Sequence, residues 1–163
     1  MEKPLWAPWR MEFIRAEKPA GCIFCLFPAE QGEEADHRNL IVHRSARAFT
    51  ILNRFPYNNG HLLVVPRAHV SRLEDLPADD FADLQAELRL AVVAVRDAYA
   101  PEGMNVGMNL GKVAGAGIAD HLHWHIVPRW GGDTNFMPVL SDTRVMIEHL
   151  DQSWTRIRAA FGA

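Results

Sequence analysis

Three histidines occupy alternate positions in one short stretch of the chain. His121, His123 and His125 are separated by one residue each, with apolar residues between and after them. Side chains of a β-strand alternate between its faces, so a strand over residues 121–127 would bring the three imidazoles to one face. The chain has only eight histidines, so this grouping predicts a use for titratable nitrogens or metal ligands rather than a merely polar strand face.

A pair of cysteines forms a second group of potential ligands. Cys22 and Cys25 are separated by two residues, a spacing that lets both thiolates reach one metal ion from a tight turn. A redox-active pair is expected after a strand and at the start of a helix, and the proline-rich sequence before Cys22 argues against it. A structural zinc ion needs four ligands, so histidines would have to complete the site. Two reduced thiols without a metal are the alternative.

The sheet that must hold the histidines is predicted from β-branched and aromatic residues bounded by turn residues. Besides the histidine strand, four short strands are expected, at residues 39–43, 47–53, 62–65 and 104–110. Pro128 is expected to end the histidine strand, because proline lacks a backbone donor. Asn and Gly in the turn 56–60 favour a reversal of the chain, so its two flanking strands are expected to be antiparallel.

Two helices are predicted to cover this sheet. The first begins near Asp79, carries apolar residues at intervals of three or four, and ends before Pro101. The second occupies residues 141–163 and carries a similar apolar stripe. The order of three strands, a helix, two strands and a helix predicts an α+β fold in one domain, 1–163. A proline- and tryptophan-rich arm over 1–21 precedes it.

Composition excludes several classes of protein. The 163 residues, 48% of them apolar, suit one compact domain. A net charge of −3 gives no general attraction to nucleic acid polymers or anionic membranes, so a phosphate ligand would need local cations. No apolar run approaches the roughly 20 residues that span a bilayer, and the N-terminus lacks the apolar core of a signal peptide. We therefore expect no membrane partner and a cytoplasmic location.

The stretch 121–127 resembles the His-x-His-x-His signature of the histidine triad family, and the segments 53–69 and 103–136 resemble its flanks. The opening 5–10 and the run 128–136 are similar to the branch of diadenosine tetraphosphate phosphorylases. The resemblance covers most of the chain. It implies a five-stranded antiparallel sheet with one long helix and a C-terminal helix, a homodimer, and nucleotide substrates.

The resemblance also implies roles for individual residues. His123 is the expected nucleophile toward the α-phosphorus of a nucleotide, and His125 and His61 are expected to line the phosphate site. A structural zinc ion is expected on Cys22, Cys25, His69 and His121. No organic cofactor is implied.

Substrate contacts are expected from two asparagines and a glycine-rich loop. Asn53 matches a position at the ribose end and Asn109 a position near phosphate, although asparagines at strand ends also cap turns. The backbone amides of Gly115, Ala116 and Gly117 are expected to donate to phosphate. Many hydrolases of the family carry Gln followed by Ser or Thr at the positions of Ala116 and Gly117, and this chain has neither side chain.

Three further residues bear on substrate and acceptor. Trp130 matches a position that phosphorylase-like members use in substrate selection, where the indole would stack on a base or wall the leaving nucleotide; a packed core tryptophan is the alternative. Lys112 and Arg129 lie beside these segments and are expected to offset the charge of an incoming phosphate.

Together these inferences predict an enzyme that transfers a nucleoside monophosphate from a dinucleoside polyphosphate, such as diadenosine tetraphosphate, to inorganic phosphate. The reaction would pass through a nucleotidyl-His123 intermediate and give ADP and ATP. Hydrolysis of nucleotide esters, anhydrides or phosphoramidates by the same site is an alternative, and so is a non-catalytic nucleotide-sensing module. An oxidative β-barrel enzyme with an imidazole-bound metal is a further alternative, but it leaves the helices and the glycine-rich loop unexplained.

Overall fold

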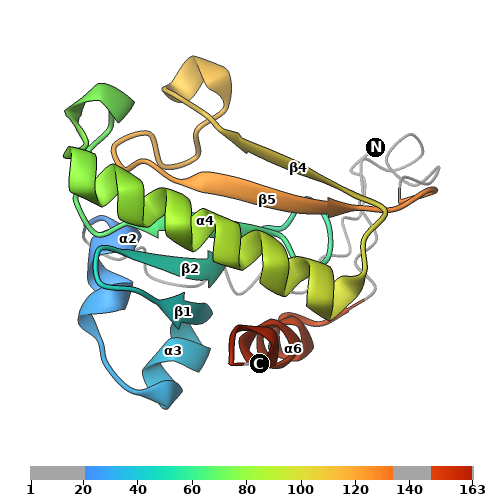
Figure 1. Ribbon diagram of the computed structural model, residues 1–163. Helices are drawn as coiled ribbons and strands as arrows, with labels where there is room; N and C mark the ends of the chain where they lie inside the picture. The colour runs from blue at the N-terminus through green and yellow to red at the C-terminus, as the bar shows by residue number, and fades with distance from the viewer. Residues whose placement is uncertain (1–20, 134–147, 163) are drawn as a thin grey trace, which may run out of the picture.

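The computed structural model describes residues 21–133 and 148–162 (Figure 1). Its strands are β1 (Ile41–Arg44), β2 (Ala48–Leu52), β3 (Leu62–Pro66), β4 (Gly103–Met108) and β5 (Trp124–Arg129). Its α-helices are α2 (Ile23–Leu26), α3 (Glu33–Asn39), α4 (Ala78–Tyr99) and α6 (Leu150–Phe161). Its 3-10 helices are η1 (Phe27–Ala29), η2 (Leu73–Asp75) and η3 (Lys112–Ala114). Apart from Gly21, the predicted N-terminal arm lies outside the described residues.

The strands form one antiparallel sheet in the order β1-β2-β3-β5-β4. The predicted α+β fold with a five-stranded antiparallel sheet is therefore confirmed. Strand β5 lies between β3 and β4, so His125 is opposite Leu63 on one side and Gly107 on the other. Strand β4 is an edge strand of this sheet.

The histidine strand begins and ends later than predicted. Pairing starts at Trp124, so His121 and His123 precede β5 and only His125 lies within it. Pro128 does not end the strand. Beyond Ile126, β5 pairs with β4 alone, and proline is tolerated where one side of a strand has no partner. The alternation of strand side chains therefore does not orient the first two histidines; individual hydrogen bonds do.

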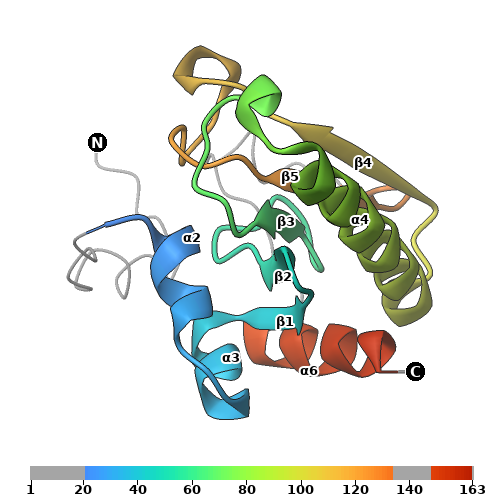
Figure 2. The same ribbon diagram turned by 60° about the vertical axis from the view of Figure 1, so that its left-hand side comes forward.

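The two faces of the sheet pack against different helices. On β2, the hydroxyl of Thr50 donates to the carboxylate of Glu87 on α4 at 2.5 Å. The neighbouring Phe49 contacts Phe24 of α2 on the other face, with ring centroids 6.4 Å apart. Helices α2 and α4 consequently lie on opposite sides of the sheet (Figure 2). Both faces of β2 are buried in this way.

Helix α4 agrees with its prediction, whereas α6 begins later than predicted. Helix α4 starts at Ala78 and ends at Tyr99, before Pro101, as the apolar spacing indicated. The N-cap of α6 is His149, whose ring accepts the backbone N–H of Asp151, and not the predicted Ser141. Residues 134–147, which include the predicted start, lie outside the described residues.

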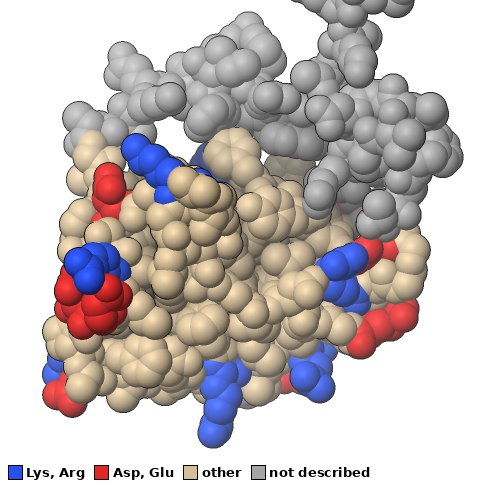
Figure 3. All heavy atoms as spheres, turned by 90° about the horizontal axis from the view of Figure 1, so that it is seen from above, with Lys and Arg blue, Asp and Glu red and all other residues tan. Residues whose placement is uncertain are grey.

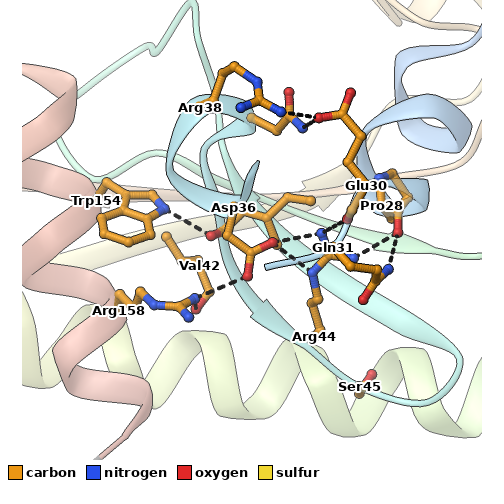
Figure 4. A network of polar contacts seen from close by, with 12 residues as sticks. Pro28, Glu30, Gln31, Asp36, Arg38, Val42, Arg44, Ser45, Trp154 and Arg158 are labelled. Carbon is orange, nitrogen blue, oxygen red and sulfur yellow. Dashed lines mark hydrogen bonds and ion pairs between the residues drawn. The ribbon is translucent and has the colours of Figure 1, made fainter. Parts of the chain in front are cut away.

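Helix α3 was not predicted, because its sequence is mostly charged and shows no apolar period. It ends at Asn39, where a strand was expected to begin, and β1 starts at Ile41. The helix is held by Arg44, which donates to Asp36 and to the carbonyl oxygens of Pro28 and Glu30, each at 2.8 Å (Figure 4). This network fixes the segment after α2 against β1.

Candidate active site and metal centre

His123 is a buried imidazole whose hydrogen bond fixes its tautomer. It lies one residue before β5 and is 5% exposed. Its Nδ1 is 2.9 Å from the backbone oxygen of His121, and a carbonyl only accepts, so Nδ1 carries the proton and donates. In the neutral ring the lone pair is therefore on Nε2, the nitrogen available for nucleophilic attack.

A chain of hydrogen bonds fixes the tautomers of His61 and His125. The backbone N–H of Tyr57 donates to Nδ1 of His61 at 3.0 Å, so the neutral His61 ring carries its proton on Nε2. Nε2 donates that proton to Nδ1 of His125 at 2.9 Å. His125 therefore carries its own proton on Nε2, a buried atom without a partner among residues 21–133 and 148–162. This N–H is a donor that can bind an anionic oxygen.

The surroundings keep these three rings neutral. Burial, followed by the nearby His125 and His123, lowers the pKa of His61 to about 3. Burial and then His123 lower the pKa of His125 to about 4. Burial also lowers the pKa of His123, against the opposing effect of its hydrogen bond to the His121 carbonyl. Near pH 7 the site thus offers one unprotonated nucleophilic nitrogen and one neutral N–H donor.

The loop before His61 is held against helix α4 at Gly60. Gly60 has a φ of 72°, and a Cβ there would lie 2.6 Å from Cε2 of Tyr99. A larger residue would strain the backbone and clash with the ring. Tyr99 packs edge-on against Trp130, with ring centroids 6.2 Å apart, and its hydroxyl donates to Glu148. The C-terminal end of α4 therefore supports the position of His61.

Four side chains converge at a candidate metal site. The donor atoms of Cys22, Cys25, His69 and His121 all lie within 4.8 Å of one another. Nε2 of His121 is 2.8 Å from the backbone oxygen of Pro66 and must donate to it, so its Nδ1 lone pair faces the sulfur atoms. Sγ of Cys22 is 3.4 Å from this Nδ1. Two thiols and two imidazoles are a donor set typical of structural zinc, so the residues fit this metal.

The segment between the two cysteines is not the predicted tight turn. Cys22 is the N-cap of α2, and Cys25 lies within this one-turn helix. The helix was missed because four residues are too few to show a helical period. Phe24, between the cysteines, is buried, and its ring centroid lies 5.5 Å from that of His121 and 5.1 Å from that of His123. The candidate metal site and the candidate nucleophile therefore share a packing partner.

Asn53 has the turn-capping role that was the alternative to a substrate contact, and it also contacts His61. Its Oδ1 accepts the backbone N–H of Phe55 at 2.9 Å. Its Nδ2 lies 3.3 Å from Nδ1 of His61 and can only donate, which agrees with the tautomer assigned above. Contact between Asn53 and a ribose stays a prediction.

The glycine-rich loop uses two of its amides internally. The N–H of Gly115 donates to the carbonyl of Lys112 at 3.0 Å, and that of Ala116 donates to the carbonyl of Gly111 at 3.3 Å. No such bond is present for the N–H of Gly117 within the described part of the chain. The loop therefore offers fewer unused amides to a phosphate than its sequence suggested, and its contact with substrate stays a prediction.

The remaining predicted contacts occupy different places. Asn109 lines a hollow beside His125, whereas Trp130 does not. Trp130 is partly exposed and packs against Tyr99, so the packed alternative describes part of its surface, and its role in substrate selection stays a prediction. Lys112 is exposed on η3.

Arg129 is already paired. Its Nε and one terminal nitrogen donate to the carboxylate of Asp133 at 2.5 and 3.0 Å. The other terminal nitrogen donates to Oδ1 of Asn105 at 2.8 Å. Its hydrogen bond to Asp133 raises the pKa of Arg129. A guanidinium balanced in this way is a weaker phosphate site than an unpaired one, because the carboxylate offsets its charge.

The hollow beside His125 has a volume of about 470 Å³. Tyr57 forms part of its wall and is 49% exposed. The Tyr57 ring lies 4.8 Å from that of His61 and nearly parallel to that of His125, with an interplanar angle of 13°. Sequence reasoning treated Tyr57 only as a turn residue. The signal that could have identified it is an aromatic side chain in a turn just before a predicted catalytic histidine.

Comparison with known proteins agrees with this fold. The family model described as the HIT domain matches residues 34–132, so the chain belongs to the histidine triad (HIT) family. A protein of Mycobacterium tuberculosis named AP-4-A phosphorylase is 41% identical over 148 residues, which cover 87% of this chain and 75% of that protein. An uncharacterized HIT-like protein of Saccharolobus solfataricus is 33% identical, with 81% and 94% coverage.

Among solved structures, a zinc-bound histidine triad family protein from Mycobacterium smegmatis superposes with a TM-score of 0.67. It is 28% identical, and the match covers 87% of this chain and 94% of that protein. The protein described above is thus a nucleotide-processing enzyme of the HIT family. Within residues 21–133 and 148–162, no helix has the length and apolar character needed to cross a bilayer.

The converging donor set predicts one zinc ion per chain. Cys22→Ser should remove most of the zinc and lower the melting temperature, because a four-coordinate structural metal contributes directly to folding. Elemental analysis of protein purified without chelator, combined with thermal unfolding, measures both effects. A zinc-free protein whose Cys22→Ser variant is equally stable would contradict this assignment.

The lowered pKa values predict loss of stability in acid. The folded pKa values of His61 and His125, about 3 and 4, lie below the 6.5 of an unperturbed imidazole, so between these limits the unfolded chain binds protons that the folded chain does not. The contribution of each neutral imidazole to the free energy of unfolding is therefore complete above pH 6.5. It decreases as the pH falls, by about 2 kcal/mol per imidazole at pH 5. Urea unfolding at several pH values should show a shallower fall for His61→Gln; parallel curves would refute the argument.

Proposed function

We propose that the protein transfers a nucleoside monophosphate from a dinucleoside polyphosphate of the diadenosine tetraphosphate type to inorganic phosphate. The observation that carries this proposal is the pair of fixed tautomers. His123 presents a lone pair on Nε2, and the adjacent His125 presents a proton on Nε2. Their ring centroids are 4.9 Å apart, close enough for both rings to contact one phosphoryl group. A nucleotide-sensing module would need no such nucleophile.

In the first step, Nε2 of His123 attacks the α-phosphorus. A P–N bond forms, the bond from phosphorus to the bridging oxygen breaks, and ATP leaves with that electron pair. The N–H of His125 donates a hydrogen bond to an oxygen of the transferring group, where negative charge accumulates. Because these donors and acceptors are already oriented, little reorganisation is needed during the reaction.

In the second step, an oxygen of hydrogenphosphate attacks the same phosphorus. The P–N bond breaks, its electron pair returns to Nε2 of His123, ADP forms, and the proton of hydrogenphosphate passes to solvent. Support for phosphate as acceptor comes from the relative named AP-4-A phosphorylase and from the missing Gln and Ser or Thr side chains in the loop. Among the two cations suggested by the sequence, Lys112 suits the incoming anion better than Arg129, because Asp133 balances the latter.

Product analysis tests the acceptor. With diadenosine tetraphosphate and millimolar phosphate, ADP and ATP should form in equal amounts, because phosphate resolves the nucleotidyl-histidine. Without phosphate, the reaction should stall or give AMP slowly. Separation of nucleotides by anion-exchange chromatography distinguishes the two. AMP as the main product in abundant phosphate would make the enzyme a hydrolase.

His123→Ala is the control for this experiment. It should lower turnover by several orders of magnitude, because alanine has no nucleophilic atom, while nucleotide binding by calorimetry persists. Circular dichroism checks that the fold is retained. A variant with near-normal turnover would show that His123 is not the nucleophile.

We also propose that the protein is a homodimer. Strand β4 is an edge strand with Val106 exposed, and α4 exposes Leu90 and Val93. The described part of the face in Figure 3 carries its Lys, Arg, Asp and Glu residues mainly toward the margins. Unpaired edges and exposed apolar side chains favour association. Light scattering at micromolar concentration should give twice the chain mass; a monomer would contradict the proposal.

A further inference from the structure

The hollow beside His125 is separate from the position of the nucleophile. Its lining includes His125 but not His123. In a displacement at phosphorus, the leaving group departs on the side opposite the attacking nitrogen. A leaving group expelled by Nε2 of His123 therefore moves away from the His123 ring. The hollow, which lies beside His125, is the space that we assign to it. Its volume of about 470 Å³ is within the range of roughly 300–1,000 Å³ typical of small-molecule sites.

The charge balance of the hollow favours a neutral group over additional phosphate. Among the described residues of its lining, the guanidinium is that of Arg129, and it is bound to the carboxylate of Asp133, which lines the same space. The other polar side chains among the described residues of its lining are neutral: Tyr57, His125 and the amides of Asn58, Asn105 and Asn109. Amides both donate and accept hydrogen bonds, as the edges of a nucleobase do. An anionic polyphosphate would instead need unbalanced cations.

Two residues give the hollow its shape. Gly107 lies directly opposite His125 in the sheet, and a Cβ built on it would have no atom within 4 Å. The missing side chain therefore leaves open space next to the imidazole. Tyr57 supplies an aromatic wall that is 49% exposed. A flat, partly exposed ring beside an open strand surface is suited to stacking with a base.

We propose that this hollow binds the second nucleoside, the one carried by the leaving nucleotide, with Tyr57 stacking on its base and Gly107 leaving room for that nucleoside beside His125. This inference rests on the proposed transfer reaction and adds a second nucleoside subsite to it. The subsite makes the enzyme selective for substrates with a nucleoside at both ends of the phosphate chain.

A pair of substrates isolates this subsite. Diadenosine tetraphosphate and adenosine 5′-tetraphosphate share the adenosine and four phosphates, and only the former has a second nucleoside. Wild-type protein should show a higher kcat/KM for diadenosine tetraphosphate, expressed mainly as a lower KM. Tyr57→Ala should reduce this preference by about 10- to 100-fold, the range expected for loss of one base–aromatic stack.

Matched controls are available on the same elements. Phe55→Ala removes an aromatic side chain that is 44% exposed in the same loop but does not line the hollow, and it should leave the preference unchanged. Gly107→Val fills the space beside His125 and should selectively raise the KM for diadenosine tetraphosphate. Gly103→Val, on the same strand and outside the lining, should not.

The outcomes separate this inference from the proposed function. Transfer from both substrates with no preference in wild type, or an equal loss on both substrates in Tyr57→Ala and Gly107→Val, would overturn the second subsite while leaving the transfer reaction intact. Absence of transfer from either substrate by wild-type protein would instead overturn the proposed function on which the subsite rests.

Discussion

The hydrogen bond from Nδ1 of His123 to the backbone oxygen of His121 determines which nitrogen can act as a nucleophile. The peptide carrying that oxygen is itself held, because Nε2 of His121 donates to the carbonyl of Pro66 at the end of β3. The same His121 ring turns its other nitrogen toward Cys22 and Cys25. Sheet, candidate metal site and candidate nucleophile are thus connected through successive hydrogen bonds that leave little freedom to any of them.

A second set of contacts approaches the site from the loop between β2 and β3. Here the backbone N–H of Tyr57 sets the tautomer of His61, which in turn sets that of His125. A backbone N–H can only donate and a backbone oxygen can only accept. The Tyr57 N–H and the His121 oxygen therefore determine which nitrogen of His61 and of His123 carries the proton. Desolvation lowers the pKa values of both His61 and His125 and so keeps this arrangement in place. Protonation of either ring would put an N–H on Nδ1, where it would face another N–H donor.

The sequence was informative where a regular period decides structure and uninformative where single tertiary contacts do. The apolar period of α4 and the approximate positions of the five strands along the chain were predictable, because apolar patterning and turn residues mark them in the sequence. Helices α2 and α3 were not, since one is too short and the other is held by Arg44 and its partners. The start of β5 at Trp124 depends on how far β3 and β4 extend.

The candidate site shows the same division. The convergence of two cysteines and two histidines followed from the family signature, and their donor atoms do lie together. The tautomers, the pairing of Arg129 with Asp133 and the internal bonds of the glycine-rich loop did not follow, because each depends on backbone geometry or on a neighbour chosen by the fold. The position of Tyr57 beside His61 and His125 was also not predicted, because it depends on the same tertiary contacts.

The contact between Gly60 and Tyr99 links parts of the chain that are distant in sequence. A gap too small for a methyl group means that the loop before His61 cannot shift toward α4 unless the tyrosine ring moves first. That ring also contacts Trp130 after β5 and Glu148 before α6. The loop before His61, the end of α4, the segment after β5 and the segment before α6 are therefore expected to open together in hydrogen exchange, as one cooperative unit. The Tyr99 side chain would then protect the amides around His61 from exchange.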